Sequence, residues 1–170
     1  MSSNGEPKKI LIISQYLFPT PEKNYEVKES IEKLAEQGHN ISVIARKASS
    51  ETAFEIKNTK FYFIEQDNFS SGSEWSYILQ NISFMWKAIK IGSALEGNFD
   101  LVIATMPTGF AGIAANIVAG KKEAKFYLDI KENWVESAIA ANYISNGSPI
   151  HKAAVIVDNW VLKRGEKFSL

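Results

Sequence analysis

Short apolar runs, rich in β-branched residues, recur along the chain and are separated by segments with helical periodicity. The runs lie at residues 9–13, 40–45, 59–64, 99–104 and 124–128. A continuous apolar run such as residues 9–13 is typical of a strand buried on both faces of a parallel sheet. Because such strands alternate with helices here, the pattern predicts a doubly wound α/β fold with right-handed crossovers and the strand order 3-2-1-4-5.

The helices are predicted between these runs. In the first, Val27, Ile31 and Leu34 share one face, and Gly38 is expected to cap its C-terminus. Further helices are predicted over residues 74–95, 109–120, 132–143 and 150–168. In the last of them, Trp160, Val161 and Leu162 are candidates to pack on something outside the chain.

The helix predicted over residues 74–95 is apolar on more than one side. One stripe is formed by Trp75, Ile78, Leu79, Ile82, Trp86 and Ile89, and four apolar residues lie off it: Tyr77, Phe84, Met85 and Ile91. A helix of this kind needs a second surface to cover it. Core packing explains the pattern, but a partner, a further domain or a membrane surface remains open. The membrane hypothesis involves Trp75, Tyr77, Phe84, Met85 and Trp86.

Composition narrows the class of protein. The 170 residues are enough for one domain with a core, expected over residues 8–170 after a mobile leader at residues 1–7. Nineteen basic residues balance nineteen acidic ones, so no overall basic field points to nucleic acid. The chain has no cysteine and two histidines, which excludes a thiolate site and disfavours a histidine metal site. No apolar segment approaches the roughly 20 residues of a membrane span.

The common nucleotide-binding and hydrolase motifs are absent. The loop after the first strand contains no glycine, so the Gly-x-Gly-x-x-Gly fingerprint of dinucleotide binding is missing. The sequence also lacks a Gly-x-x-x-x-Gly-Lys-Ser/Thr phosphate loop and a Gly-x-Ser-x-Gly nucleophile elbow. We therefore expect no bound cofactor.

Polar residues that follow the strands are the candidates for chemistry. With the predicted strand order, loops 14–24 and 105–109 flank the topological switch point, and residues 129–137 lie beside them. Asp129 comes directly after the fifth apolar run, where ligands of open α/β sheets usually bind. The alternative is that Asp129 and Glu132 only cap the next helix.

Four segments resemble the N-terminal half of family 4 glycosyltransferases, retaining enzymes with two Rossmann-like domains in the GT-B arrangement. These segments are residues 10–19, 34–43, 99–108 and 129–137. The last is similar to an Asp-x-Arg-Asp-x-Trp-Pro-Glu-Ser motif of the subgroup that builds bacterial capsule, O-antigen and colanic-acid-type polysaccharides on lipid carriers. Here Lys131 and Glu132 replace the Arg-Asp pair, and residues 22–25 replace a Gly-Gly pair of the family's first loop. These departures put acceptor specificity and activity in question.

The resemblance implies a function and a set of site residues. It implies transfer of a sugar from a nucleotide-sugar to a lipid-linked or saccharide acceptor, in the cytoplasm at the inner face of the cell membrane. Asp129 and Glu132 would be catalytic, orienting the acceptor hydroxyl or accepting its proton. The acceptor-binding candidates are Gln15, Tyr16, Lys23, Asn24, Thr108 and Lys131. The two lysines, Lys23 and Lys131, could bind an acceptor phosphate. Trp134 is expected in the core.

The chain is interpreted as the acceptor-side domain, without the C-terminal domain that holds most of the nucleotide-sugar in this family. Alone it is expected to be inactive. Two other functions remain open: a non-catalytic α/β binding or assembly domain, which the missing glycines favour, and half of a sugar-nucleotide epimerase, which shares the two-domain architecture.

Overall fold

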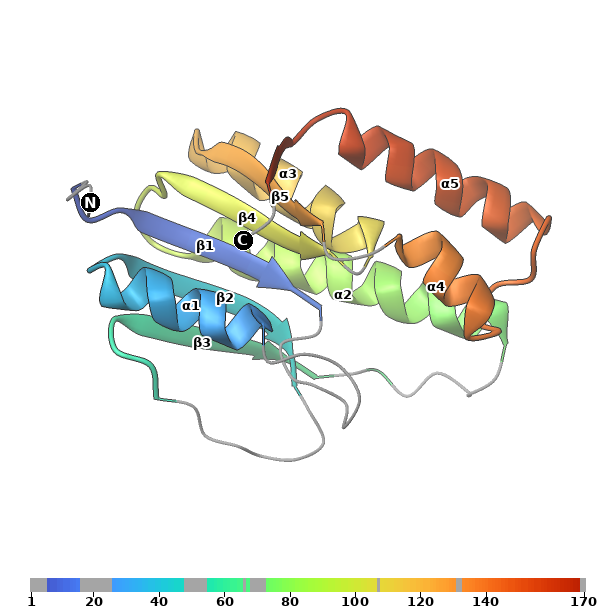
Figure 1. Cartoon of the computed structure of the whole chain (residues 1–170), viewed down its shortest axis with the longest axis horizontal. Coiled ribbons are helices and arrows are strands. Elements are labelled where there is room, and N and C mark those ends of the chain that lie inside the picture. The colour runs from blue at the N-terminus through green and yellow to red at the C-terminus, as the bar shows by residue number, and fades with distance from the viewer. Residues whose placement is uncertain are drawn as a thin grey trace.

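A parallel sheet runs through the middle of the molecule (Figure 1). The computed structural model describes residues 6–15, 26–47, 55–65, 67, 73–106, 108–130 and 133–168. Within these residues the sheet has six strands in the order β3-β2-β1-β4-β5-β6, and all neighbours are parallel. The strands are β1 (Lys9–Ser14), β2 (Asn40–Arg46), β3 (Thr59–Ile64), β4 (Leu101–Met106), β5 (Lys125–Ile130) and β6 (Glu166–Phe168). The predicted fold class and the order 3-2-1-4-5 are confirmed.

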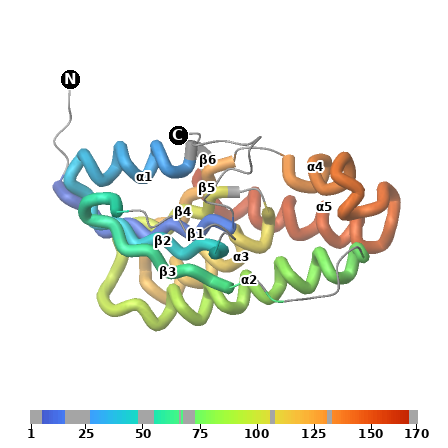
Figure 2. The backbone as a smooth tube through the Cα atoms, turned by 90° about the horizontal axis from the view of Figure 1, so that it is seen from below, coloured from blue at the N-terminus to red at the C-terminus, as the bar shows by residue number. Residues whose placement is uncertain are grey.

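Helices cover both faces of this sheet, as a doubly wound fold requires. They are α1 (Glu26–Glu36), α2 (Glu74–Ala94), α3 (Gly109–Lys122), α4 (Trp134–Ala140) and α5 (Pro149–Leu162). Figure 2 shows α1 on one side of the strands and α2 and α3 on the other. Alternate residues of β1 therefore enter different cores: Ile12 packs with Ile31 of α1, whereas Ile13 belongs to the cluster that contains Phe84 of α2.

The turn between α1 and β2 follows the sequence prediction. Gly38 has a φ of +88°, which a residue without Cβ adopts at little cost. Its N–H donates to the carbonyl of Ala35 at 3.0 Å, and the N–H of His39 donates to the carbonyl of Leu34 at 3.3 Å. These bonds satisfy carbonyls at the helix end and turn the chain directly into β2.

The end of the chain differs from the prediction. The last helix stops at Leu162 instead of continuing to residue 168, and β6 then pairs with β5. The close approach depends on Gly165, where an added Cβ would lie 2.5 Å from Cγ of Leu128. Helix α4 is also shorter than predicted, covering 134–140 instead of 132–143. For the last helix, Lys163 and Arg164 followed by Gly165 are a helix-stop signal, which the apolar pattern of residues 150–162 concealed.

Helix α2 turns only part of its large apolar stripe to the core, since Ile89 is buried and Ile78 and Ile82 pack against the core. Phe84, Ala88 and Gly92 are buried, whereas Trp75 is 67% and Trp86 is 62% exposed. The inclusion of Phe84 in a membrane-facing set is therefore wrong, since this side chain is core. Small residues explain the setting, because an added Cβ at Gly92 would lie only 3.0 Å from the α3 side chain of Val118.

Helices α3 and α5 pack tightly against each other at Gly112 and Val161. Val161 is fully buried within this chain, so the idea that it packs on something outside is wrong. A methyl group added at Gly112 would lie 2.3 Å from Cγ1 of Val161, a stiff β-branched side chain. We expect Gly112→Ala to lower the free energy of unfolding by about 1–3 kcal/mol, measured by urea denaturation, although alanine is the better helix former.

Gly120 is the matched control for this prediction. It lies in the same helix, and no atom lies within 4 Å of an added Cβ there. Gly120→Ala is therefore expected to leave stability unchanged or raise it by up to about 1 kcal/mol. In the Gly112→Ala background, Val161→Ala should cost less than it does in the wild type. Equal stability of the two glycine variants would contradict this account of the helix contact.

Candidate active site at the carboxyl edge of the sheet

Three buried polar residues form one row across the carboxyl ends of neighbouring strands. Ser14 of β1 pairs in register with Thr105 of β4, which pairs in register with Asp129 of β5. Their exposed fractions are 0%, 3% and 1%. Because side chains alternate along a strand, they lie on the same face as Ile12 and Ile103, which is the face covered by α1. We call Ser14, Thr105 and Asp129 the strand-end row.

Asp129 lies inside β5 and does not cap the following helix. The strand continues to Ile130, one residue beyond Asp129. The N-cap of α4 is Asn133, whose side-chain oxygen accepts from the N–H of Glu136 at 3.4 Å. The capping interpretation of Asp129 is therefore wrong, and Glu132 lies outside the described residues. A carboxyl group is thus held at the strand end, at the edge where open α/β sheets bind ligands.

A second polar group joins the end of β1, the interior of α2 and the start of α3. The side-chain N–H of Gln15 donates to Oδ1 of Asn81 at 2.5 Å, and the hydroxyl of Thr108 donates to Oε1 of Gln15 at 2.6 Å. Asn81 in turn donates to the carbonyl of Tyr77 at 2.8 Å. Gln15, Asn81 and Thr108 are all at most 1% exposed. We call these three residues the buried amide network.

The network brings together two predicted acceptor-binding residues, Gln15 and Thr108, and adds one that sequence reasoning missed. Thr108 is the N-cap residue of α3, but its hydroxyl bonds to Gln15 and makes no side-chain cap bond. The network therefore ties together the two chain segments that leave β1 and enter α3, on either side of the switch point. The role of Gln15 and Thr108 in acceptor binding stays a prediction. The signal for Asn81 was an amide inside an otherwise apolar helical stretch.

The remaining predicted site residues cannot be placed. Tyr16, Lys23, Asn24, Lys131 and Glu132 all lie outside the described residues. Their assignment to acceptor binding and catalysis stays a prediction from the sequence.

Trp134 is a core residue, as predicted, and anchors α4 to α3 and α5. It is 2% exposed, and its ring meets that of Phe110 edge-on with a centroid distance of 6.1 Å. Its indole N–H donates to Oδ1 of Asp158 at 2.8 Å. Burial raises the pKa of the Asp158 carboxyl, and the bond from Trp134 partly opposes this shift. Trp134 is therefore not a platform for a bound sugar.

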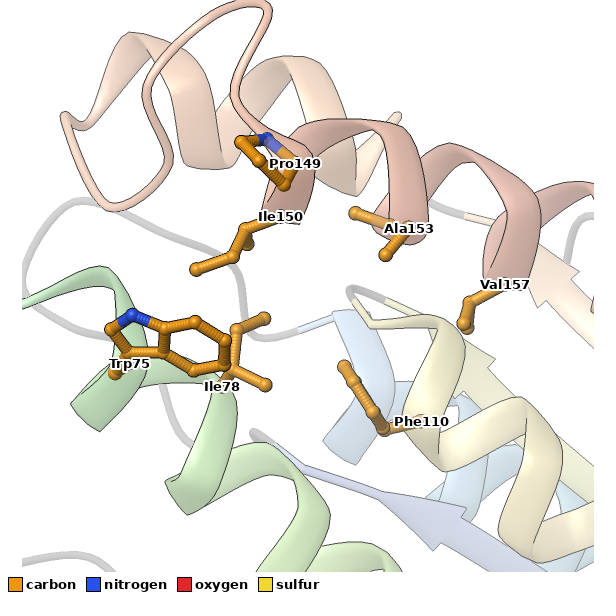
Figure 3. A pocket seen from close by; sticks show the side chains of 8 residues that line it. Trp75, Ile78, Phe110, Pro149, Ile150, Ala153 and Val157 are labelled. Atoms are coloured by element: carbon orange, nitrogen blue, oxygen red, sulfur yellow. The ribbon is translucent and has the colours of Figure 1, made fainter.

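A separate apolar groove opens between α2, α3 and α5 (Figure 3). Its volume is about 190 Å³, and it is lined by Trp75, Ile78, Phe110, Pro149, Ile150, Ala153, Ala154 and Val157. None of the predicted site residues lines it. Phe110 nevertheless follows Thr108 by two residues, so the groove begins at the same end of α3 as the buried amide network.

The described residues contain no candidate metal site. In these ranges no group of three or more His, Asp or Glu side chains could hold an ion. Likewise, none of the helices in the described part of the chain is both long and apolar enough to cross a membrane.

Comparison with known proteins shows the fold alone. The sequence matches no family model and no curated protein. The structure is similar to the C-terminal domain of the PF1911 hydrogenase from Pyrococcus furiosus, with a TM-score of 0.55 and 13% identity over 72% of this chain and 91% of that one. It is also similar to CalG4, the calicheamicin glycosyltransferase, with a TM-score of 0.52 and 13% identity. That match covers 94% of this chain and 42% of CalG4, so the chain spans less than half of that enzyme.

Proposed function

We propose that this chain is the acceptor-side domain of a retaining glycosyltransferase that acts in cell-surface polysaccharide synthesis. One observation carries the proposal. Three of the segments that resemble family 4 glycosyltransferases come together at the carboxyl edge of the sheet, where one polar residue of each, Ser14, Thr105 or Asp129, belongs to the strand-end row. This edge is where open α/β sheets bind their ligands. The match of 94% of the chain to part of a glycosyltransferase supports the same function at the level of fold.

The proposed reaction transfers a sugar from a nucleotide-sugar to a hydroxyl of a lipid-linked or saccharide acceptor. The bond between the anomeric carbon and the diphosphate oxygen breaks, and a bond to the acceptor oxygen forms. Asp129 would orient the acceptor hydroxyl and take its proton, a role that suits a carboxylate held in a fixed position. Stabilising the departing diphosphate would fall mainly to a second domain.

That second domain is part of the proposal. The chain spans 42% of CalG4, and a domain of similar size would complete a two-domain enzyme. Intact-mass measurement of the native protein from its source cells tests this directly. We expect a product of about twice the present length, since each domain runs ~100–200 residues. A native chain that ends near Leu170 would remove the donor-binding half and contradict the proposal.

The activity is tested by incubating the native protein with labelled nucleotide-sugars, with and without lipid-linked and saccharide acceptors. We expect label to move to an acceptor, and we expect the present chain alone to transfer none. Interconversion of the free nucleotide-sugar would instead identify a sugar-nucleotide epimerase. Acceptor binding without either reaction would identify a non-catalytic binding domain.

A further inference from the structure

Helices α2 and α5 each carry an apolar stripe on the side turned away from the core. On α2, Trp75, Leu79 and Trp86 are 67%, 44% and 62% exposed. On α5, Ile156 and Trp160 are 69% and 36% exposed. Within each helix neighbouring members of the stripe are four or seven positions apart, which places them on one face. Three of the four tryptophans of the chain lie on these two stripes.

The groove between the helices joins the two stripes into one surface. Figure 3 shows Trp75 and Ile78 on the α2 side, Pro149, Ala153 and Val157 on the α5 side, and Phe110 of α3 beneath them. Trp75 belongs both to the groove and to the α2 stripe, and Ala153 lies three positions before Ile156 on α5. We call the two stripes and the groove the α2–α5 apolar surface.

Basic residues outnumber acidic ones on the two helices of this surface, although the whole chain has no net charge. Residues 74–94 and 149–164 contain two acidic and five basic residues, a net charge of +3. Both acidic side chains accept hydrogen bonds from within the chain: Glu74 accepts from the N–H of Ser145 at 2.8 Å, and Asp158 accepts from the indole N–H of Trp134. The basic residues are Lys90, Lys152, Lys163 and Arg164, together with Lys87, which forms a salt bridge with Asp67 at 2.6 Å.

Three of these basic residues lie next to the apolar stripes. Lys90 and Lys152 are exposed and lie four positions from Trp86 and Ile156, on the same helix faces. The guanidinium of Arg164 lies 3.7 Å from the ring centre of Trp160. Exposed tryptophan and leucine flanked by lysine and arginine are the combination that binds the interface of an anionic lipid bilayer.

We propose that the α2–α5 apolar surface docks on the headgroup region of an anionic lipid bilayer. A second copy of the chain fits this surface less well, because a two-fold interface would bring cations of both copies together. The docking is independent of the proposed transfer reaction and is measured without it. It would also bring the end of α3 that carries Thr108 close to the bilayer, a consequence that matters for lipid-linked acceptors only if the proposed function holds.

Binding to sonicated vesicles tests the proposal. We expect the chain to co-sediment with vesicles of equal parts phosphatidylglycerol and phosphatidylcholine, much less with phosphatidylcholine alone, and less as salt is added. Tryptophan fluorescence should shift to the blue on binding, because Trp75 and Trp86 leave water while Trp134 is already buried. Replacing Trp75, Leu79 and Trp86 together with serine should weaken binding at least about tenfold.

The charge contribution is tested by Lys90→Ala with Lys152→Ala, which should weaken binding roughly 25-fold, since each basic residue near an anionic surface contributes about fivefold. The matched controls are Phe63→Ser and Lys33→Ala. Phe63 is 41% exposed and stacks on Phe61, which packs on the α1 face of the sheet, and Lys33 is exposed on α1. Both should bind vesicles like the wild type, and circular dichroism checks that all variants are folded.

Two results would overturn the proposal. One is vesicle binding that the serine and lysine variants leave unchanged. The other is absence of vesicle binding by the wild-type chain. In that case, self-association that is measured by sedimentation velocity and abolished by the serine variants would assign the α2–α5 apolar surface to an interface between copies of the chain.

Discussion

Replacing Trp134 with alanine is expected to lower the free energy of unfolding by about 3–5 kcal/mol, the usual cost of truncating a fully buried aromatic residue. The ring is 2% exposed and fills the space between α4, α3 and α5, where it contacts Phe110. Its removal also leaves the partly buried carboxyl of Asp158 without the indole N–H that it accepts from. Urea denaturation followed by circular dichroism measures the loss.

Trp75→Ala is the matched control, because the same side chain is removed from a position that is 67% exposed. Its effect should stay within about 0.5 kcal/mol. Trp134→Phe separates packing from hydrogen bonding, since it keeps an aromatic ring and removes the N–H, and should cost about 1–3 kcal/mol. Equal effects of Trp134→Ala and Trp75→Ala would show that the contact with α3 and α5 does not stabilise the fold.

Trp134→Phe also bears on how the stability of the fold depends on pH. Burial raises the folded-state pKa of Asp158 above its unfolded value, so the folded chain holds the extra proton between these two values. The stability that this group contributes is therefore present at low pH and is lost as the pH rises through that window. Trp134→Phe removes the bond that opposes the shift, so we expect it to raise the Asp158 pKa further. Titration of the Asp158 carboxyl carbon by NMR measures this change.

Gln15→Leu is expected to lower the free energy of unfolding by about 2–5 kcal/mol. It removes the partner of both the Asn81 oxygen and the Thr108 hydroxyl, and each group is buried. A buried polar group left without its partner costs about 1–3 kcal/mol. The leucine side chain is one bond shorter but fills a similar volume, so the loss reports hydrogen bonding more than packing. Thermal and urea unfolding measure it.

Gln37→Leu is the matched control, because Gln37 is an exposed glutamine in the turn after α1, and its effect should stay within about 0.5 kcal/mol. Combining Gln15→Leu with Asn81→Leu should cost less than the sum of the two single changes, since the pair shares one bond. Strict additivity would show that the amide network does not act as a unit.

The fold could be predicted where one strand corresponds to one uninterrupted apolar run. Strand β1 has this property, β2 to β5 have largely apolar runs with one or two polar residues, and the alternation of these strands with helices favours the observed order. Strand β6 has no apolar run, since it reads Glu-Lys-Phe, and it exists only by pairing with β5. The orientation of α2 could not be predicted from the apolar pattern either, because α2 packs on Val118 of α3 through Gly92, where an added Cβ would lie 3.0 Å from that side chain.

The site could be predicted only as far as the topology fixes it. Gln15, Thr108 and Asp129 were singled out because they follow strands at the switch point, and all three lie at the carboxyl edge of the sheet. Asn81 was missed because it lies 66 residues from Gln15 along the chain, and which way a long helix turns its one buried amide depends on packing. The sequence also suggested that Asp129 could be a helix cap, a role that Asn133 fills.

The most direct test of the proposed active site compares two aspartates in the transfer assay on the native protein. Asp129→Asn should lower kcat/KM at least about 100-fold, as expected when a group that handles the proton of the nucleophile is lost. Asp100→Asn should retain transfer within about twofold. Asp100 lies at the opposite edge of the sheet, where its carboxylate accepts from the N–H of Lys9 at 2.7 Å. Wild-type transfer by a folded Asp129→Asn variant, or equal losses in both variants, would contradict the assignment of catalysis to the carboxyl edge.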